Sequence, residues 1–323
     1  MENNSNMQAN PSMDNSFEES NARPKKGLGM FLKISLFGVL VGLVGLFVYE
    51  YLRIAPDDVR FTNVTSSSVT VSWNTKSPIS ATAMVFEGDT WMPVTVLGLG
   101  GERFYDTRDV TKAKLEETYK VPIDSEELSF SVEDIQTEIT VEEMGEYYTH
   151  HVTLTGLNPE TEYSFMIGDT YLFRKIGDAS GGSSVETTAV PENISPPFPA
   201  YGSIKDAEGR EAASVEELVA VSDGVVYFNY LDQDTGERST VHSGSLNEGG
   251  NWYIDVSLLG KFVSERLNQE DLLVELEVDA GPQGLWKKGI DINLISPVES
   301  VIINDPLAHR DFRFGVEQIG TLL

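Results

Sequence analysis

Histidine and cysteine are the side chains that most often bind metals or act as catalytic bases, and this chain has few of them. It contains four histidines and no cysteine. His150 and His151 are adjacent, so in a strand their rings point to opposite faces and cannot bind one metal together. His242 and His309 lie far from them along the chain. We therefore predict no metal site and no cofactor.

One acidic stretch begins like a calcium-binding loop. Asp232, Asp234 and Gly236 follow the spacing of the first positions of such a loop. The twelfth position requires Glu, whereas Ser243 stands there. A β-hairpin turn explains the same residues, because Asp-Gln-Asp-Thr-Gly lies between two strand-like runs. We predict the hairpin.

The common catalytic motifs are missing from the sequence. It has no Gly-x-Ser-x-Gly nucleophile elbow, no P-loop and no His-Glu-x-x-His zinc motif. A binuclear metallophosphatase needs several His and Asp ligands around two metals, and four histidines are too few for such a site. We therefore predict that the protein is not an enzyme. An extracellular hydrolase with an unrecognised site is the alternative.

Three aromatic residues are candidates for ligand binding. Trp91, Tyr105 and Trp286 would offer flat apolar rings to a glycan if they were exposed. They support a second alternative, in which the chain is a substrate- or glycan-binding accessory subunit of a membrane complex.

A long apolar stretch near the N-terminus determines where these residues would act. The 22 residues of Gly27–Val48 contain one charge, Lys33. At about 1.5 Å per residue they would extend roughly 33 Å, which matches a hydrocarbon core of about 30 Å. A buried helix of a soluble domain is the alternative, but an unbroken apolar run of this length favours a transmembrane helix.

Charged residues beside this stretch indicate its orientation. Arg23, Lys25 and Lys26 precede it, whereas Arg53 and Arg60 follow. The excess of positive charge places the N-terminus in the cytoplasm and the rest of the chain outside the cell membrane. The run ends without the small residues of a signal-peptide cleavage site. We predict a single-pass, uncleaved signal anchor over residues 27–53.

The apolar stretch also carries a motif for helix association. Gly38 and Gly42 are spaced as a Gly-xxx-Gly pair, which allows two transmembrane helices to approach closely. Dimerisation through these glycines is one predicted partner interaction.

The net negative charge of the chain limits the classes of partner that it can bind. Five basic and five acidic residues precede Ile54, so the whole formal charge of −28 belongs to the part that follows. Such a surface repels nucleic acids and anionic headgroups. A protein or glycan ligand at the cell surface remains as the expected partner.

Composition divides the chain further. Residues 1–26 are rich in Asn, Ser and Glu and contain few large apolar residues, which predicts a disordered cytoplasmic tail. Four prolines within 191–199 predict a stiff linker. We expect one domain over 54–190, a second over 200–304 and a C-terminal tail over 305–323.

The first domain shows strand patterns in a specific order. Val69, Val71 and Trp73 share one face at period two after a Ser-rich turn, and residues 154–165 read Leu-x-x-Leu-x-Pro-x-Thr-x-Tyr-x-Phe. These motifs resemble a fibronectin type III domain. The resemblance implies an immunoglobulin-like β-sandwich in which Trp73 is the core tryptophan. It also implies that the hydroxyl of Tyr163 bonds back to the backbone near Leu157.

Residues 89–147 form an insertion that is too long for a seven-strand sandwich. They include a helical pattern over 109–120 and most of an acidic stretch over 125–148 that reads as a strand pair. Similar modules of bacterial surface proteins carry Asp-x-Arg-Asp here, before Tyr-x-x-His, and the matching residues are Asp106, Arg108, Asp109, Tyr148 and His151. This element is either a ligand-binding loop or an ion pair in which both aspartates hold Arg108 and fix the insertion to the sandwich. We prefer the ion pair.

The second domain also reads as strands and turns. Strand-like residues run to Tyr230, and Trp252, Ile254 and Val256 share one face after a Gly-Gly turn. The order resembles the carboxypeptidase-regulatory-like β-sandwich, with a last strand near 297–303. The expected fold class is therefore all-β, with an N-terminal transmembrane helix and two tandem sandwiches. We predict a membrane-anchored surface protein with a non-enzymatic adhesion, spacing or envelope-scaffold role.

Overall fold

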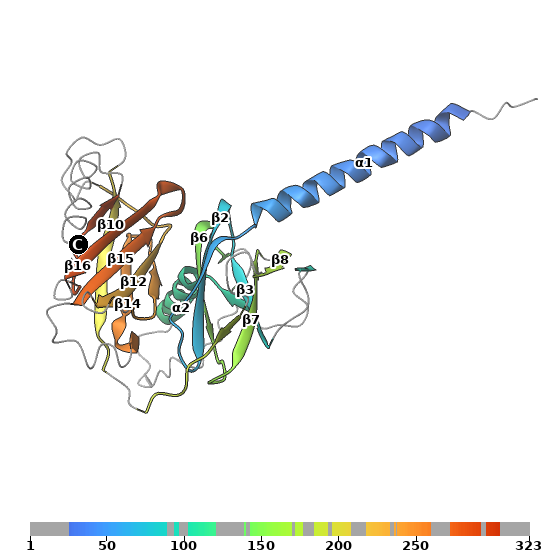
Figure 1. The fold of residues 1–323 in the computed structure, drawn as a ribbon. Coiled ribbons are helices and arrows are strands. Elements are labelled where there is room, and N and C mark those ends of the chain that lie inside the picture. The colour runs from blue at the N-terminus through green and yellow to red at the C-terminus, as the bar shows by residue number, and fades with distance from the viewer. Residues whose placement is uncertain are drawn as a thin grey trace, which may run out of the picture. The chain divides into compact units, whose positions relative to one another are not determined.

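The structure is a computed structural model of the whole chain (Figure 1). It describes residues 26–88, 94–96, 103–120, 139, 143–169, 172–176, 184–192, 196–207, 218–232, 236, 238–259, 272–291 and 295–303. The predicted tail over 1–26, the acidic strand pair of the insertion and the tail over 305–323 lie almost wholly outside these residues. Met1–Tyr49 and Glu50–Leu323 form two separate compact units.

The N-terminal unit contains most of helix α1, Lys26–Arg53. Its segment Lys33–Arg53 has a mean hydropathy of 1.9 and is long and apolar enough to cross a membrane or to serve as a signal sequence. Its apolar side chains are exposed all round, which is the pattern of a helix that meets lipid rather than one protein face. Gly38 and Gly42 have open space where a Cβ would stand, so a second helix could approach there.

The Glu50–Leu323 unit begins with a pair of antiparallel sheets. The smaller sheet has the order β1-β2-β6, from Asp57–Thr62, Ser68–Ile79 and Tyr147–Thr155. The motif residues Val69, Val71 and Trp73 lie on β2 and are buried. They alternate with polar residues because successive side chains of a strand point to opposite faces.

The second sheet of this pair is centred on β7, Glu162–Gly168. One edge of β7 pairs with β3, Thr82–Glu87, which in turn pairs with β5, Arg103–Tyr105. The other edge pairs first with β8, Leu172–Lys175, and then with β9, Ser184–Glu186. The short strand β4, Val94–Val96, completes the sheet beyond β8.

The two sheets enclose one hydrophobic core. Trp73 lies within this core, where it is 1% exposed and packs near Phe165 and Leu154. At one end of the sandwich, the Asn158 N–H donates to the Tyr163 hydroxyl at 2.8 Å, one residue beyond Leu157. This bond holds the turn before β7 against the strand, as in a tyrosine corner.

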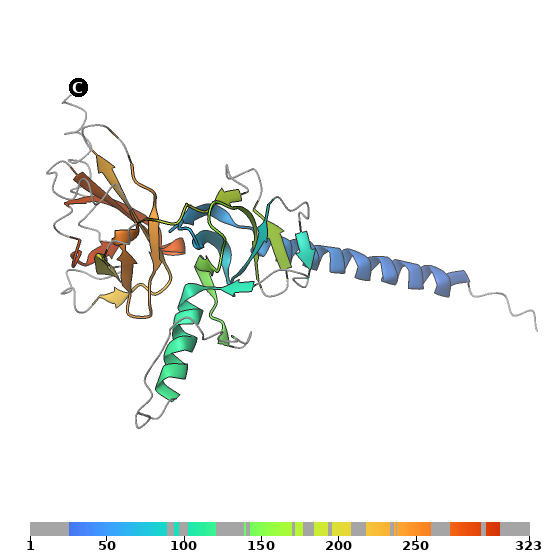
Figure 2. The same ribbon diagram turned by 90° about the horizontal axis from the view of Figure 1, so that it is seen from below.

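Part of the 89–147 segment belongs to this sheet pair. The strands β4 and β5 both extend the second sheet. The chain then changes sheets at Asp106, which pairs with Val152 of β6. Helix α2, Thr107–Lys120, follows directly. Its first turn lies beside β6 and its other end leads away from the sheets (Figure 2).

Residues 199–303 form a second pair of sheets. One has the order β13-β12-β15-β16, with bounds His242–Ser245, Val225–Asp232, Leu272–Asp279 and Leu285–Asp291. The other contains β11, β10 and β14, with bounds Val219–Ala220, Pro199–Asp206 and Asn251–Asp255. The last strand, β17, Val301–Ile303, pairs in parallel with β10. Two short 3₁₀ helices, Val256–Leu259 and Gly281–Gln283, follow β14 and β15.

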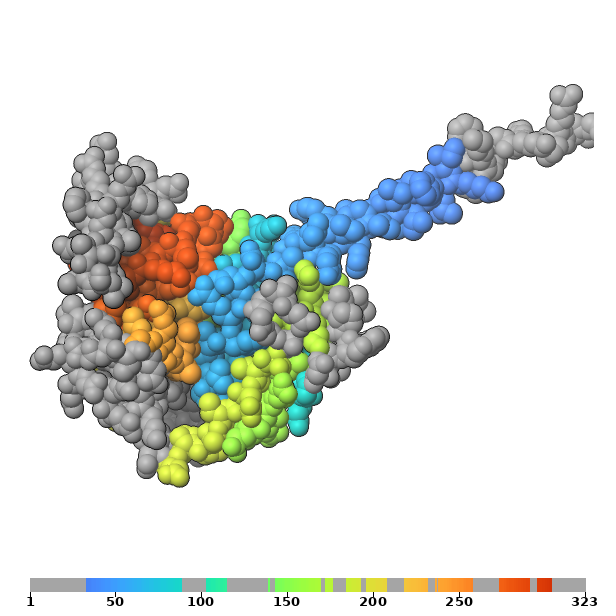
Figure 3. Space-filling model, in the orientation of Figure 1, coloured from blue at the N-terminus to red at the C-terminus, as the bar shows by residue number. Residues whose placement is uncertain are grey.

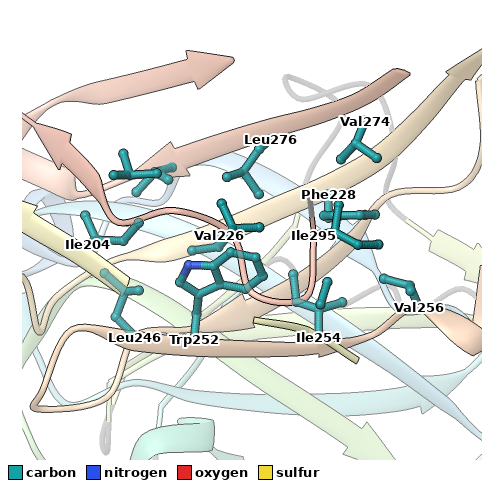
Figure 4. Close-up of a cluster of buried hydrophobic side chains, with 14 of the residues drawn as sticks. Ile204, Val226, Phe228, Leu246, Trp252, Ile254, Val256, Val274, Leu276 and Ile295 are labelled. Carbon is teal, nitrogen blue, oxygen red and sulfur yellow. The ribbon is translucent and has the colours of Figure 1, made fainter. Parts of the chain in front are cut away.

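Apolar side chains from both of these sheets meet in a second core. Trp252 and Ile254 of β14 face Phe228 of β12 and Leu276 of β15 (Figure 4). Val256 extends the inward face of β14, so the alternation seen in the sequence is the buried side of the strand. Strands β12 and β13 are antiparallel neighbours, as the predicted hairpin requires, and Leu231 pairs with Arg238. Residues 233–235 of the predicted turn lie outside the described residues.

Candidate functional site

The outer face of the β1-β2-β6 sheet is polar but buried. Thr70 and Ser72 of β2 are inaccessible, although they point away from the Trp73 core. Thr149 and His151 of β6 lie on the same outer face and are also buried. The second sheet pair covers them, and the two surfaces are in contact in the space-filling view (Figure 3). We call this interface the polar junction; the residues on its second side are Asp223, Tyr227, Ser243, Glu277 and Asp279.

Ser243 of β13 lies at the centre of the polar junction. Its hydroxyl lies 2.9 Å from His151 Nε2 and 2.5 Å from the hydroxyl of Thr62. The side-chain amide of Asn63 accepts from Ser243 N–H and donates to Ser243 C=O, each at 2.9 Å. Asn63 therefore pairs with β13 as a neighbouring strand would, and its φ of 50° is one that asparagine tolerates.

A second group of contacts joins β2 to β12 and β15. The Tyr227 hydroxyl donates to Ser72 Oγ at 2.9 Å, and Asn74 Nδ2 donates to Asp279 Oδ2 at 2.7 Å. Arg60 of β1 pairs with Glu277 at 2.8 Å and lies over the Tyr227 ring. Ser72, Asn74 and Arg60 thus each gain a partner across the junction, whereas Thr70 bonds to Asn63 and Thr153 of its own sheet pair.

Arg108 joins the start of α2 to both sheet pairs. Its Nε and Nη2 donate to the two carboxylate oxygens of Asp106 at 2.8 and 2.9 Å. Nη1 donates to Asp223 Oδ1 at 3.3 Å, and Nη2 also donates to the Thr149 carbonyl. The guanidinium lies 3.6 Å from the Tyr147 ring centroid. This planar, bidentate arrangement is one that arginine, but not lysine, can make.

Asp106 has three roles at this point. It is the N-cap of α2, because its Oδ1 accepts from the Arg108 N–H at 3.1 Å. Its Oδ2 accepts from the His151 N–H at 3.0 Å, and both oxygens hold the guanidinium. Burial alone would raise the pKa of Asp106, but the charge and hydrogen bonds of Arg108 outweigh burial and lower it. The carboxylate is therefore ionised and paired.

Asp223 comes from the second sheet pair and binds the start of β6. Its Oδ2 accepts from the Tyr148 N–H at 2.7 Å. Its Oδ1 accepts from the Thr149 N–H at 3.1 Å and from the Thr149 hydroxyl at 2.7 Å. One carboxylate thus satisfies two backbone donors of a strand in the other sheet pair.

Asp109 faces the chain that leads into β6. Its Oδ1 accepts from the Tyr147 hydroxyl at 2.9 Å and from the Gly145 N–H at 3.0 Å. Burial and the nearby Asp106 charge raise the pKa of Asp109. The sequence predicts that Asp106 and Asp109 hold Arg108 together, whereas the second carboxylate that contacts the guanidinium is Asp223. No local pattern reveals Asp223, because it follows Arg108 by 115 residues.

Three histidines are buried in uncharged form. His150 packs on Trp73 with its Nε2 at 2.9 Å from the Thr75 hydroxyl, and burial lowers its pKa to about 3. Burial likewise lowers the pKa of His151 and of His242 to about 4. The rings of His150 and His151 point to opposite faces of the sheet. No group of three or more metal-binding side chains occurs among the described residues.

The Ser243–His151 contact has the geometry of a nucleophile and its base. His151 Nδ1 lies 3.0 Å from the Thr107 hydroxyl, which occupies the position of an orienting group. However, Ser243 is 5% exposed and His151 is 3% exposed. A catalytic base works best with a pKa near the operating pH, whereas that of His151 is about 4. The arrangement serves to fix the polar junction.

The two aromatic candidates that the structure describes, Tyr105 and Trp286, lie on different sheet pairs. Trp91 lies outside the described residues, and Tyr105 is half-buried on β5. Trp286 of β16 is half-buried and packs on the second core. The exposed aromatic pair of the second sheet pair is instead Tyr201 with Tyr253, and sequence reasoning missed both. A signal was present for Tyr253, which alternates with the buried Trp252 and Ile254 along β14, whereas β10 shows no such regular alternation around Tyr201.

Comparison with known proteins finds a family model that is similar to the first sheet pair. The model of the family described as Purple acid Phosphatase, N-terminal domain matches residues 56–187, which is less than half of the chain. The match covers every strand from β1 to β9, and its antiparallel sheets form a fibronectin type III-like β-sandwich. A comparison with curated proteins gives no match.

Similar solved structures include two chicken proteins with fibronectin type III domains. One is the crystal structure of chicken CNTN1 FN1-FN3 domains, with 11% identity over 76% of this chain and 66% of that chain, and a TM-score of 0.21. The other is a two fibronectin type III domain segment of chicken tenascin, with 11% identity over 73% of this chain and 98% of that chain, and a TM-score of 0.17. The chain thus spans just under two thirds of the first. The matched family is, by its description, the N-terminal domain of a phosphatase. The described residues of this chain show no catalytic site.

Proposed function

We propose that the protein is a membrane-anchored, non-enzymatic scaffold or adhesion protein. In this proposal α1 crosses the cell membrane once with the N-terminus in the cytoplasm. Two β-sandwich domains, 54–190 and 200–304, stand outside it. The apolar helix supports the anchor, and the excess of positive charge before it supports the orientation.

The polar junction is the observation that carries the proposed role. It buries a sheet face that would otherwise meet water and places both sheet pairs in one compact unit. A tandem of freely moving domains needs no such interface, because ordinary interdomain contacts are small and permit motion. A spacer or scaffold that presents a partner at a fixed distance from the membrane does need it.

Distances between spin labels test this role. The chain has no cysteine, so Thr155→Cys with Lys288→Cys gives two unique labels, one on each sheet pair. The full chain in detergent should give one narrow distance distribution, and Asp223→Ala should broaden it. A broad distribution in the otherwise unchanged chain would refute a fixed spacer. Membrane anchorage is tested separately, because full-length protein should sediment with membranes after carbonate washing.

A second candidate function follows from the matched family. Since that family is by its description the N-terminal part of a phosphatase, this chain could act as an accessory subunit beside a phosphohydrolase. Purified full-length protein should then be inactive on phosphate monoesters alone but co-purify with a phosphatase activity from membranes. Hydrolysis by the chain itself, sensitive to chelators, would instead support an enzyme.

A further inference from the structure

A polar cleft opens beside the junction. Its volume is about 220 Å³, and it lies between the outer face of the β1-β2-β6 sheet and strand β14. Four hydroxyl side chains of the first sheet pair line it: Thr65, Ser68, Thr70 and Thr153. Asn63 adds an amide, and Tyr253 and Asp255 of β14 form the opposite wall. Ser243 and Ile254 complete the lining, which combines hydrogen-bonding side chains and one carboxylate with apolar surface.

Two of these hydroxyls, those of Ser68 and Thr153, retain hydrogen-bonding capacity, whereas Thr65 Oγ1 already accepts from the Ser67 and Ser68 N–H groups and Thr70 is fully buried. The Thr70 and Thr153 hydroxyls lie 3.0 Å apart, and those of Thr65 and Ser68 lie 2.8 Å apart. A hydroxyl offers one donor and two acceptor lone pairs, so a pair that bonds internally can still accept from a ligand. Asp255 Oδ1 accepts two backbone N–H groups, from Phe198 and Ser257. Its carboxylate is therefore held in place at the edge of the cleft.

An aromatic surface adjoins the cleft. Tyr253 is 58% exposed, and Tyr201, its direct register partner on β10, is 42% exposed. Directly paired side chains of neighbouring strands stand about 5 Å apart on one face, so the two rings form a continuous patch. Their neighbours Trp252 and Ile254 point into the core. Tyrosine beside small hydroxyl and amide side chains is also the composition of binding surfaces that recognise polar ligands.

Size and charge restrict the ligand. A cleft of about 220 Å³ is smaller than the roughly 300–1,000 Å³ of pockets that enclose a drug-sized molecule. The cleft has room for one unit of a polymeric ligand, and the next unit of that ligand would lie on Tyr201 and Tyr253. The formal charge of −28 disfavours polyanions. A neutral chain with many hydroxyls and apolar ring faces meets all these conditions.

We propose that this cleft and the Tyr201–Tyr253 surface together bind a neutral polysaccharide. One sugar unit exchanges hydrogen bonds with the hydroxyl-lined cleft, and an adjacent unit stacks its apolar ring face on Tyr253. The inference deepens the surface role proposed above by naming the class of ligand. Neither Tyr105 nor Trp286 is among the residues that line this site.

Affinity electrophoresis of the full chain tests the proposal. The protein is kept in a polyoxyethylene detergent, because a sugar-headed detergent would compete for the site. An α-glucan, a β-glucan and a mannan are the neutral probes, and polygalacturonate is the acidic one. At least one neutral polymer should retard the protein and polygalacturonate should not. Absence of retardation by all three neutral polymers, or equal retardation by polygalacturonate, would overturn the proposal.

Variants then locate the site. Tyr253→Ala should weaken binding by about two- to tenfold, the range expected for losing one aromatic stacking contact, while Tyr253→Phe should bind as before. Thr153→Val removes one cleft hydroxyl and should also weaken binding. If Thr153→Val does not fold, Ser68→Ala serves as the hydroxyl variant instead. Tyr105→Ala is the control aromatic and should change nothing. Binding that survives both Tyr253→Ala and the hydroxyl variant would overturn the site. The spin-label distances and the membrane sedimentation test the proposed scaffold role independently of these binding results.

Discussion

The three buried histidines predict a steep loss of stability in mild acid. Each is neutral when folded, with a pKa of about 3 for His150 and about 4 for His151 and His242. An unfolded histidine has a pKa of about 6.5. Below that value the unfolded chain binds protons that the folded chain does not, so the free energy of unfolding falls as the pH falls.

The size of this effect at pH 5 depends mainly on the unfolded pKa. Since pH 5 lies about 1.5 units below 6.5 and above each folded pKa, each histidine costs about 2 kcal/mol relative to pH 7.5. The three together would lower the free energy of unfolding by about 6 kcal/mol, comparable to the total stability of about 5–15 kcal/mol of many proteins. The raised pKa values of Asp109 and Asp279 act in the opposite direction as the pH falls towards 4.

Urea denaturation between pH 5 and pH 7.5 measures this loss. Tryptophan fluorescence follows the unfolding of both cores, since Trp73 is almost fully buried in one and Trp252 in the other. The summed free energy of unfolding should change most steeply between pH 5 and 6.5. His242→Asn should reduce that slope by about one third, because it removes one of three titrating groups. A stability at pH 5 within about 1 kcal/mol of that at pH 7.5, or an unchanged slope in the variant, would refute the buried neutral histidines.

Four further substitutions test individual contacts by urea denaturation at pH 7.5. Asp223→Ala should lower the free energy of unfolding by about 1–3 kcal/mol, because it leaves two N–H groups of β6 without their acceptor. The site is partly exposed to water, which limits this cost. An effect below about 0.5 kcal/mol would show that Asp223 does not stabilise the junction. Tyr163→Phe should cost about 0.5–1.5 kcal/mol through the lost bond to the Asn158 N–H, and no change would deny the tyrosine corner. Gly236→Ala and Gly250→Ala form a matched pair, because both glycines have a φ near +70°. A Cβ added at Gly250 would lie 2.6 Å from the Ile204 carbonyl oxygen, whereas a Cβ added at Gly236 has nothing within 4 Å. Gly250→Ala should therefore be the more destabilising by at least about 1 kcal/mol, and equal costs would place the whole effect in the backbone conformation.

The strands of both cores could be predicted from the sequence because their signal is local. Val69, Val71 and Trp73 alternate with polar residues over a few positions, and Trp252, Ile254 and Val256 do the same. The short strands β4 and β5 could not be predicted. Each has three residues and depends on pairing with β8 or β3, which lie far along the chain. Such strands exist because a neighbouring edge is available, not because of their own pattern.

The polar junction was beyond sequence reasoning because its residues look like a solvated face. A signal was nevertheless present. The outward residues of β2 between Ser68 and Asn74 are Ser, Thr and Asn, and those of β6 between Thr149 and Thr155 are Thr and His. A solvated strand face in an acidic protein would be expected to carry Lys and Glu. A run of small uncharged polar residues fits a surface that must satisfy hydrogen bonds after losing water.

A polar interface of this kind determines geometry more than it adds stability. Buried polar and ionic pairs gain little over an apolar interface of the same shape, because desolvation cancels most of the attraction. A displaced register, however, would leave the Asp223 carboxylate and the buried Tyr227 hydroxyl without their partners across the junction, at a cost far above that of sliding one apolar face over another. The two sheet pairs therefore have one arrangement that satisfies their donors and acceptors. That property suits a protein whose role is to hold a binding surface at a fixed position.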